Sequence, residues 1–144
     1  MTACCVDASI VVKWAVKGEP HRKKAHALLK DAGVNSIILI APPIIVSESD
    51  SAIRKRVFDG KMAIDEAHKA YAILDAAPLR IVETPGLRQR AREIAEQFNQ
   101  RFVYDATYAA LAELQGCEFW TADKAFFDAV KVSLPFVKYL PDYK

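Results

Sequence analysis

Residues 3–9 read Ala-Cys-Cys-Val-Asp-Ala-Ser, a brief run of small and β-branched residues that ends on a carboxylate. The first part, Ala3–Val6, is a strand candidate, because such residues pack well on a pleated surface. Ile37–Ala41 is a second candidate, and its five apolar residues predict a strand buried on both faces. Further strands are expected at Arg80–Val82, Cys117–Thr121 and Phe136–Tyr139.

The stretches between these strands repeat apolar residues at the spacing of an amphipathic helix. Thr84-Pro85 indicates one helix start, with threonine as the N-cap and proline in the first helical position. Short buried strands that alternate with helices predict an α/β domain over residues 1–144, with a central parallel sheet of about five strands flanked by helices. The other helices are expected over His21–Asp31, Pro43–Val57, Ile64–Leu74 and Tyr104–Gln115.

Composition excludes several classes of protein. With 52% hydrophobic and 26% charged residues, the chain is neither disordered nor of low complexity. A formal net charge of +2 excludes a histone-like binder, so any affinity for nucleic acid must come from local patches. The longest apolar run, interrupted by Pro42 and Pro43, is too short to cross a membrane. Three cysteines without a CxxC motif support neither a disulfide framework nor a zinc site, and indicate a reducing, cytoplasmic compartment.

Four acidic residues stand where a parallel sheet binds its ligands, beyond the carboxyl ends of the strands. Asp7 directly follows the first strand and Asp123 follows the fourth. Glu48 lies in the first turns of the helix after the second strand, and Asp105 lies at the start of another helix. If the sheet brings them to one edge, their carboxylates repel one another unless a cation binds. Such an all-oxygen site suits a hard cation such as Mg²⁺ or Mn²⁺.

Each acid also has a structural interpretation. An aspartate at a helix start is usually an N-cap or a partner of the helix dipole, worth about 0.3–1 kcal/mol. Other chemistries lack their motifs: there is no phosphate-binding GxxxxGK[ST] loop, no GxGxxG, and no histidine at a predicted strand end for a Ser-His-Asp hydrolase. The occurrence of four acids in four separate segments therefore favours the metal site.

Four blocks of this sequence resemble the PIN-domain family, and most closely the VapC-type toxins of toxin–antitoxin pairs. Each block is short, but their order and spacing cover almost the whole chain. The resemblance implies a single PIN-like domain. The blocks are Val6–Trp14, Pro43 with Glu48 and Ile53–Lys55, Tyr104–Ala112, and Thr121–Phe127.

By this resemblance, four acids form a catalytic and metal-binding set, here called the acidic quartet: Asp7, Glu48, Asp105 and Asp123. The hydroxyls of Ser9 and Thr121 match positions that support such a set. The resemblance implies endonucleolytic, Mg²⁺- or Mn²⁺-assisted hydrolysis of RNA phosphodiester bonds. It also implies a small antitoxin as partner and a homodimer. One departure is that Asp50 and Ser51 stand where many relatives carry an asparagine shortly after the glutamate.

Several residues near the quartet in sequence are candidates for contact with RNA. Basic runs are most often solvated helix faces, but cations close to the site can hold phosphates. Trp14 and Trp120 are candidates for stacking on bases, although Trp120 lies within a strand and is expected to pack in the core. The basic candidates are Lys13, Arg54, Lys55 and Lys124.

Two other functions remain open. One is a non-catalytic PIN-like module that binds RNA or protein, which RNA binding insensitive to EDTA would favour. The other is a structure-specific DNA nuclease with the same metal site, although this compact chain leaves little room for the extra helices that thread DNA. Cleavage of RNA or of DNA separates the two nucleases.

Overall fold

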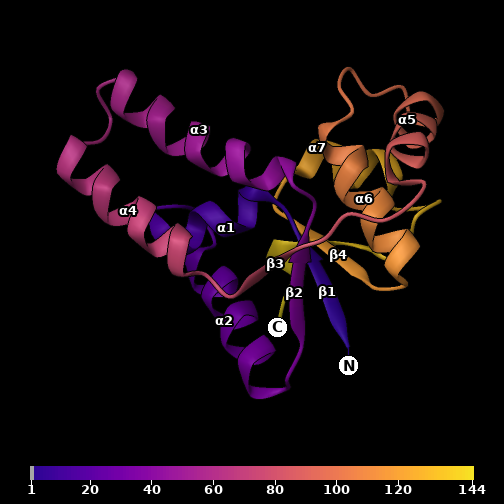
Figure 1. The fold of residues 1–144 in the computed structure, drawn as a ribbon, viewed down its shortest axis with the longest axis horizontal. Coiled ribbons are helices and arrows are strands. Elements are labelled where there is room, and N and C mark those ends of the chain that lie inside the picture. Colours follow the sequence, from indigo (N-terminus) through magenta and orange to yellow (C-terminus); the bar gives the residue numbers. More distant parts are fainter. Residues whose placement is uncertain (1) are drawn as a thin grey trace.

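The computed structural model describes residues 2–144. Its centre is a five-stranded sheet in the order β3-β2-β1-β4-β5, in which every neighbouring pair is parallel (Figure 1). This confirms the five-stranded parallel α/β fold expected from the sequence. The strands are β1 Ala3–Val6, β2 Ile38–Ala41, β3 Leu79–Ile81, β4 Glu118–Thr121 and β5 Val137–Tyr139.

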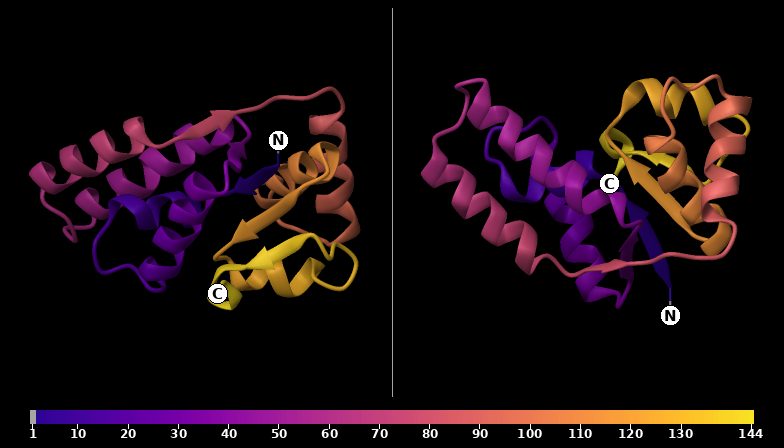
Figure 2. Two further views of the ribbon diagram at one scale, coloured as in Figure 1. Left: turned by 90° about the horizontal axis from the view of Figure 1, so that it is seen from below. Right: turned by 45° about the horizontal axis from the view of Figure 1, so that its top comes forward.

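Helices flank the sheet in two groups. The first four lie on one side of the sheet in Figure 1 and the last three on the other, and the further views agree (Figure 2). No helix in residues 2–144 has the length and apolarity that a membrane crossing needs. The helices are α1 Ala8–Ala15, α2 Arg22–Val34, α3 Ile44–Phe58, α4 Ile64–Ala76, α5 Leu87–Gln97, α6 Tyr104–Gln115 and α7 Lys124–Val130, followed by a 3-10 turn at Leu140–Asp142.

Two short helices, α1 and α7, are additional to the sequence prediction. Each begins directly after a strand, and an aspartate caps it: Asp7 for α1 and Asp123 for α7. Helix α1 packs against α2, α3 and α4, so five consecutive residues, Ile10–Trp14, are buried. The helix has only eight residues, so its sequence spans too few turns for a periodic pattern to predict it.

The start of α5 differs from the prediction. Thr84-Pro85 is not an N-cap followed by the first helical residue. Instead, the backbone N–H of Leu87 donates to the Thr84 carbonyl, and Gly86 precedes the helix with φ 85°. Because this left-handed conformation suits glycine, the chain turns at Gly86 and the helix begins at Leu87.

Two groups of buried side chains hold the fold together. The larger one lies on both faces of the sheet, where β1 is the central strand and Cys5 and Val6 are fully buried. The smaller group fills the space between α1, α3 and α4, and Ile53 is at its centre. Helices α3 and α4 extend as a pair beyond the sheet (Figure 2). We call this pair the α3–α4 arm.

The sheet order determines which loops meet. Strands β1 and β4 are neighbours, with Val6 opposite Trp120 in the register. Since all strands run the same way, the residues that follow β1, β2 and β4 emerge at one edge of the sheet. Asp7 and Asp123 follow β1 and β4, and α3 begins three residues after β2. The topology thus places the predicted acids at a common edge.

Candidate metal centre

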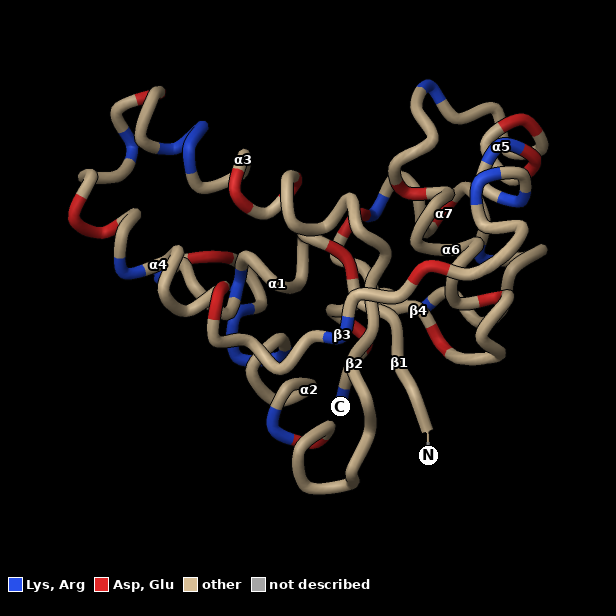
Figure 3. Tube along the Cα trace, viewed as in Figure 1, with Lys and Arg blue, Asp and Glu red and all other residues tan. Residues whose placement is uncertain are grey.

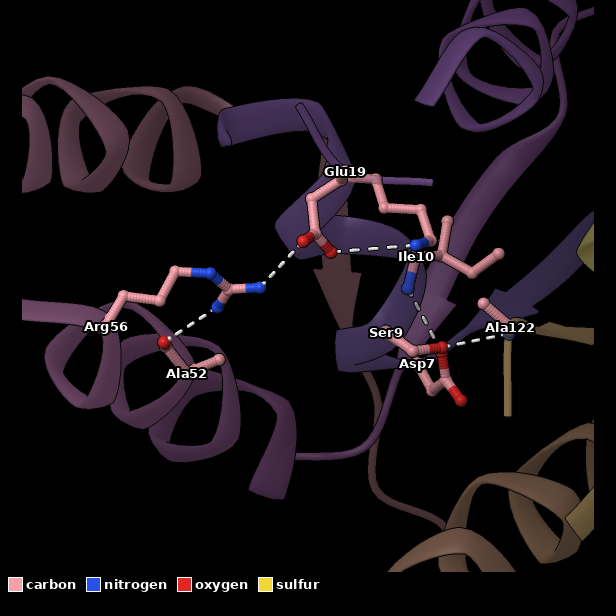
Figure 4. A network of polar contacts seen from close by, with 8 residues as sticks. Asp7, Ser9, Ile10, Glu19, Ala52, Arg56 and Ala122 are labelled. Carbon is pink, nitrogen blue, oxygen red and sulfur yellow. Dashed lines mark hydrogen bonds and ion pairs between the residues drawn. The ribbon is translucent and has the colours of Figure 1, made fainter. Parts of the chain in front are cut away.

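Asp7 is buried at the end of β1, and its carboxylate has several hydrogen-bond donors. Oδ1 accepts from the Ser9 hydroxyl at 2.5 Å and from the Ile10 backbone N–H at 3.2 Å (Figure 4). Oδ2 accepts from the Thr121 hydroxyl. Burial raises the pKa of Asp7 from 3.8 to about 6, although the hydrogen bonds from Ser9, Thr121 and Ile10 oppose this rise.

The two predicted supporting hydroxyls join neighbouring strand ends. Ser9 Oγ accepts from the Ala122 backbone N–H at 2.9 Å while it donates to Asp7. Thr121 Oγ1 similarly accepts from the Asp123 backbone N–H at 3.0 Å while it donates to Asp7. The turns after β1 and β4 are therefore fixed to each other through the Asp7 carboxylate.

Asp105 and Asp123 approach Asp7 from two other helices. Asp123 Oδ1 accepts from the Phe126 backbone N–H at 3.0 Å, so this residue is the N-cap of α7. Asp105 lies in the first turn of α6 and does not cap it. The pKa of Asp105 is raised to about 7, chiefly by burial, then by the negative charges of Asp123 and Asp7, a hydrogen bond with Asp123 and the charge of Glu48. The other three acids of the quartet thus lie close enough for their charges to affect Asp105.

Glu48 is the fourth acid and has a partner that the sequence analysis did not assign. It lies in the second turn of α3, half-buried, and its Oε1 accepts from the Tyr108 hydroxyl at 2.6 Å. Burial raises the pKa of Glu48, and the bond from Tyr108 lowers it in part. Tyr108 is itself buried and follows Asp105 by three residues on α6, so both side chains share a helix face. That spacing is the sequence signal that points to Tyr108.

No cation of the described chain neutralises the quartet, since none of the ion pairs in residues 2–144 includes one of its four acids. Carboxylates and hydroxyls, without histidine or cysteine, are the donors that Mg²⁺ or Mn²⁺ takes. As they stand in residues 2–144, no three of the potential ligands are close enough to share one ion. The donor set and its uncompensated charge therefore fit a hard divalent cation, whose binding requires the carboxylates to draw closer.

Lys13 and Trp14, which the sequence analysis proposed for contact with RNA, are both buried in this structure. Lys13 has only 8% of its side chain exposed, and its ammonium faces Glu19 at 3.6 Å. Glu19 also pairs with Arg56 at 3.0 Å (Figure 4). Trp14 is buried, and its indole N–H donates to the Ala25 carbonyl at 2.9 Å. Both residues belong to the apolar helix α1, whose burial the sequence did not reveal.

The other basic candidates are exposed, but most have carboxylate partners. Lys55 pairs with Asp59 at 2.7 Å and Lys124 with Asp128 at 2.6 Å. Arg54 lines a shallow hollow together with Asp50 and Asp75. Figure 3 shows how basic and acidic residues alternate along the α3–α4 arm. A phosphate that approaches this side therefore encounters cations whose charge is already partly offset.

Trp120 lies partly buried in β4, with its ring edge-on to Tyr143 at a centroid distance of 5.0 Å. Together with Thr2 and Gly116, it lines a hollow of about 970 Å³ at the amino ends of the strands. The quartet is at the carboxyl ends. Trp120 therefore packs on the body of the protein, as its place within a strand suggested.

The family profile of the PIN domain matches residues 4–132, which include all four acids of the quartet. The chain belongs to the PIN domain family. No curated protein matches it in sequence.

Solved structures of similar fold include two proteins of low sequence identity. VapC20 of Mycobacterium tuberculosis, described as a Sarcin-Ricin loop cleaving toxin, is 20% identical with a TM-score of 0.65. The match covers 88% of this chain and 94% of that one. PAE2754 from Pyrobaculum aerophilum is 22% identical with a TM-score of 0.62, and the match covers 89% and 86% of the two chains. At such identities the likeness establishes the shared fold.

Proposed function

We propose that this protein is a metal-dependent endoribonuclease that hydrolyses RNA phosphodiester bonds and acts as the toxin of a toxin–antitoxin pair. The observation that carries the proposal is that four carboxyl groups, from four separate segments, lie close enough for their charges to interact, without a counter-cation in the described chain. Membership of the PIN domain family and the fold shared with an RNA-cleaving toxin support it.

The quartet would hold one or two Mg²⁺ or Mn²⁺ ions through its carboxylate oxygens. When bound, such an ion supplies an activated water and offsets the charge that builds on the phosphate. The chain's own residues provide the geometry. Ser9 and Thr121 hold the Asp7 carboxylate in one orientation, and Tyr108 holds Glu48. Their hydrogen bonds reduce the freedom of the ligands and so lower the cost of assembling the site.

The proposed partners follow from the same uncompensated charge. A small antitoxin can inhibit the enzyme by placing a cationic side chain, such as an arginine, among the carboxylates. From the resemblance to VapC-type toxins alone, we also propose a homodimer. Its three free cysteines favour the cytoplasm, where they stay reduced. Sedimentation equilibrium of the purified chain tests the dimer, and a monomer at all concentrations would exclude it.

The direct test is cleavage of single-stranded RNA, structured RNA and single-stranded DNA by the purified chain, with Mn²⁺, with Mg²⁺ and with EDTA. We expect discrete RNA products that need the metal and are absent with the Asp105→Asn variant. Glu96→Gln is the matched control, since it removes one exposed carboxylate on α5 outside the quartet. Metal-independent products, or equal cleavage by Asp105→Asn, would contradict the proposal, and cleavage of DNA alone would assign a DNA nuclease.

A second candidate is a non-catalytic PIN-like module. One observation favours it: Asp7 and Asp123 each cap a helix, and no three ligands in residues 2–144 are close enough to share an ion. Two measurements separate the candidates. The nuclease predicts that the chain binds Mn²⁺ in a calorimetric titration and that Asp105→Asn weakens this binding. The module predicts that the affinity for RNA is the same with Mn²⁺ and with EDTA.

A further inference from the structure

Three consecutive apolar residues, Phe102, Val103 and Tyr104, are exposed directly before Asp105. Phe102 is 57% and Tyr104 47% exposed, and their rings stack on each other with centroids 5.5 Å apart at an angle of 30°. The Arg101 guanidinium lies over the Phe102 ring, 5.4 Å from its centroid. Two stacked aromatic rings left exposed, with a cation at their edge, are a candidate binding surface.

The backbone holds this ring pair in place. Asn99, with φ 50°, turns the chain just after α5, and the Gln100 N–H donates back to the Ala95 carbonyl at 2.8 Å. At the other end, the Thr107 hydroxyl donates to the Val103 carbonyl at 2.8 Å and so fixes the start of α6. The segment between α5 and α6 is thus anchored on both helices, which pack against each other. The backbone that carries the two rings is thus held at both ends.

A hollow lined by two arginines and one acid, Glu83, reaches Val103, the residue between the two rings. It has a volume of about 740 Å³ and lies between α5, the start of α6 and the start of α3, with Val103, Thr107 and Pro43 in its wall. Arg88 and Arg92, four residues apart on α5, also line it. Neither arginine has an ion-pair partner in residues 2–144, whereas Arg90 between them pairs with Glu113 at 2.9 Å.

We propose that Phe102 and Tyr104 form a stacking platform for an unpaired base of the RNA substrate, and that Arg88 and Arg92 hold phosphates of the same strand. The proposal rests on the proposed function and specifies its substrate class as unpaired RNA. Aromatic rings stack on any base because every base has a π-face, and free guanidinium groups match phosphate geometry. Tyr104 directly precedes Asp105 in the chain. An RNA strand with a base on the platform would therefore lie near the quartet.

The first test measures binding of a short unpaired RNA that carries a fluorescent purine analogue, with the inactive Glu48→Gln chain in Mg²⁺. Adding Phe102→Ala and Tyr104→Ala should weaken binding roughly 5- to 100-fold and abolish the fluorescence quenching that stacking causes. The conservative pair Phe102→Tyr and Tyr104→Phe should retain both. Phe58→Ala is the matched control, since it removes a ring of 80% exposure at the end of α3.

A second measurement addresses the arginines. Arg88→Gln with Arg92→Gln should make the salt dependence of single-strand binding shallower, by about 0.7 in the logarithmic slope for each phosphate that the protein no longer binds. Lys30→Gln, which removes an exposed charge on α2, should leave the slope unchanged.

A third measurement uses a fully paired RNA duplex. Its affinity for the protein should change little when the rings are removed, because its bases are already stacked.

These outcomes separate the platform from the enzyme. If the wild-type chain cleaves RNA with Mn²⁺ while the ring variants bind unpaired RNA as tightly as Phe58→Ala, the platform is wrong and the proposed function stands. An equal loss of affinity for the duplex would also overturn the platform. If the wild-type chain cleaves no RNA and the Glu48→Gln chain binds none, the proposed function fails and the platform fails with it.

Discussion

The acidic quartet lies between two sides of the molecule whose basic residues are arranged differently. On the side of α1 and α3, Lys13 and Arg56 both pair with Glu19, and Lys55 pairs with Asp59. On the side of α5 and α6, three arginines have no carboxylate partner in the described chain, and they stand beside exposed aromatic rings: Arg88, Arg92 and Arg101.

The difference shows that a basic residue close to the site in sequence is not by itself a cation available to RNA. On the first side, Glu19 and Asp59 pair with three cations, and Arg54 has no ion pair in the described chain. On the second side, Arg90 pairs with Glu113, but the other three arginines have no such partner there. The two sides also contact each other at the site, because Tyr108 of α6 donates to Glu48 of α3. Changes at the shared centre should therefore have larger effects than changes on either side.

The largest effect is expected for Asp105→Asn, which removes the acid whose pKa is raised by the charges of the other three. Activity should fall roughly a hundredfold or more, since even residues that only orient metal ligands contribute 10–100-fold. The thermal midpoint of the metal-free protein at neutral pH should rise, because a source of mutual repulsion is removed. Initial rates and thermal unfolding measure both effects. If the Asp105→Asn variant kept the activity of the wild-type chain, Asp105 would not belong to the catalytic site.

Tyr108→Phe tests the link between the two sides. Activity should fall about 10–100-fold, because Glu48 loses the group that orients it. The free energy of unfolding should fall by about 1–3 kcal/mol, the cost of a buried polar group left without its partner. A rate series in increasing Mn²⁺ provides the discriminating measurement. If higher metal concentration restores no activity and the affinity for Mn²⁺ is unchanged, Tyr108 does not position Glu48.

The pH dependence of stability tests the repulsion across the centre. Asp7 and Asp105 have pKa values of about 6 and about 7, above their ordinary value of 3.8, so the folded state binds more protons than the unfolded state in between. The free energy of unfolding of the metal-free protein should therefore fall as pH rises from about 4 to about 7. The Asp105→Asn variant should show a smaller fall.

Divalent metal supplies the complementary measurement. At neutral pH, Mg²⁺ or Mn²⁺ should raise the thermal midpoint of the wild-type chain by a few degrees, since the ion binds only the folded state. Asp105→Asn should respond less. Identical curves with metal and with EDTA would argue against a cation site between the two sides.

On the paired side, Arg56→Gln should affect stability and leave RNA binding unchanged. Its guanidinium joins α3 to Glu19 and also donates to the Ala52 carbonyl at 2.8 Å. We expect a loss of about 1 kcal/mol in the free energy of unfolding, because the pair is only partly buried. Denaturant unfolding measures the loss. A marked drop in RNA affinity at equal stability would break the contrast between the two sides.

The smallest effect is expected for Lys55→Gln. Lys55 is exposed and shares its charge with Asp59, so the salt dependence of RNA binding should hardly change. The same measurement on Arg88→Gln should show the shallower slope of a protein that binds fewer phosphates. Equal slopes for the two variants would remove the distinction between paired and free cations.

Much of the site could be predicted because its residues occur at recognisable places along the backbone. Asp7 and Asp123 follow predicted strands, and parallel strands deliver such residues to one edge. These two acids are also the N-caps of α1 and α7. The same carboxylates therefore fit both a helix-capping role and the proposed metal-binding role. Asp105 caps no helix, and its pKa is raised first by burial and then by the charges of acids distant in sequence.

Lys13 and Trp14 show that a local sequence pattern does not determine whether a side chain is exposed. The place of Lys13 just after Asp7 in sequence predicts an RNA surface, but α1 is enclosed by three helices and carries this lysine inward to Glu19. Trp14 is buried for the same reason. Neither outcome is visible in the run Ile10–Trp14, because the burial results from packing against three other helices.

The sequence by itself determined the five strands, most of the helices, the family and the position of the four acids at strand ends or helix starts. These features follow from residue type and spacing, which act over a few neighbouring residues. Tertiary structure decided which acids repel one another, which hydroxyls hold Asp7 and Glu48, and which cations are free. Those properties depend on burial and on partners from remote segments, because electrostatic energies in a protein are set by distance in space and by the exclusion of water.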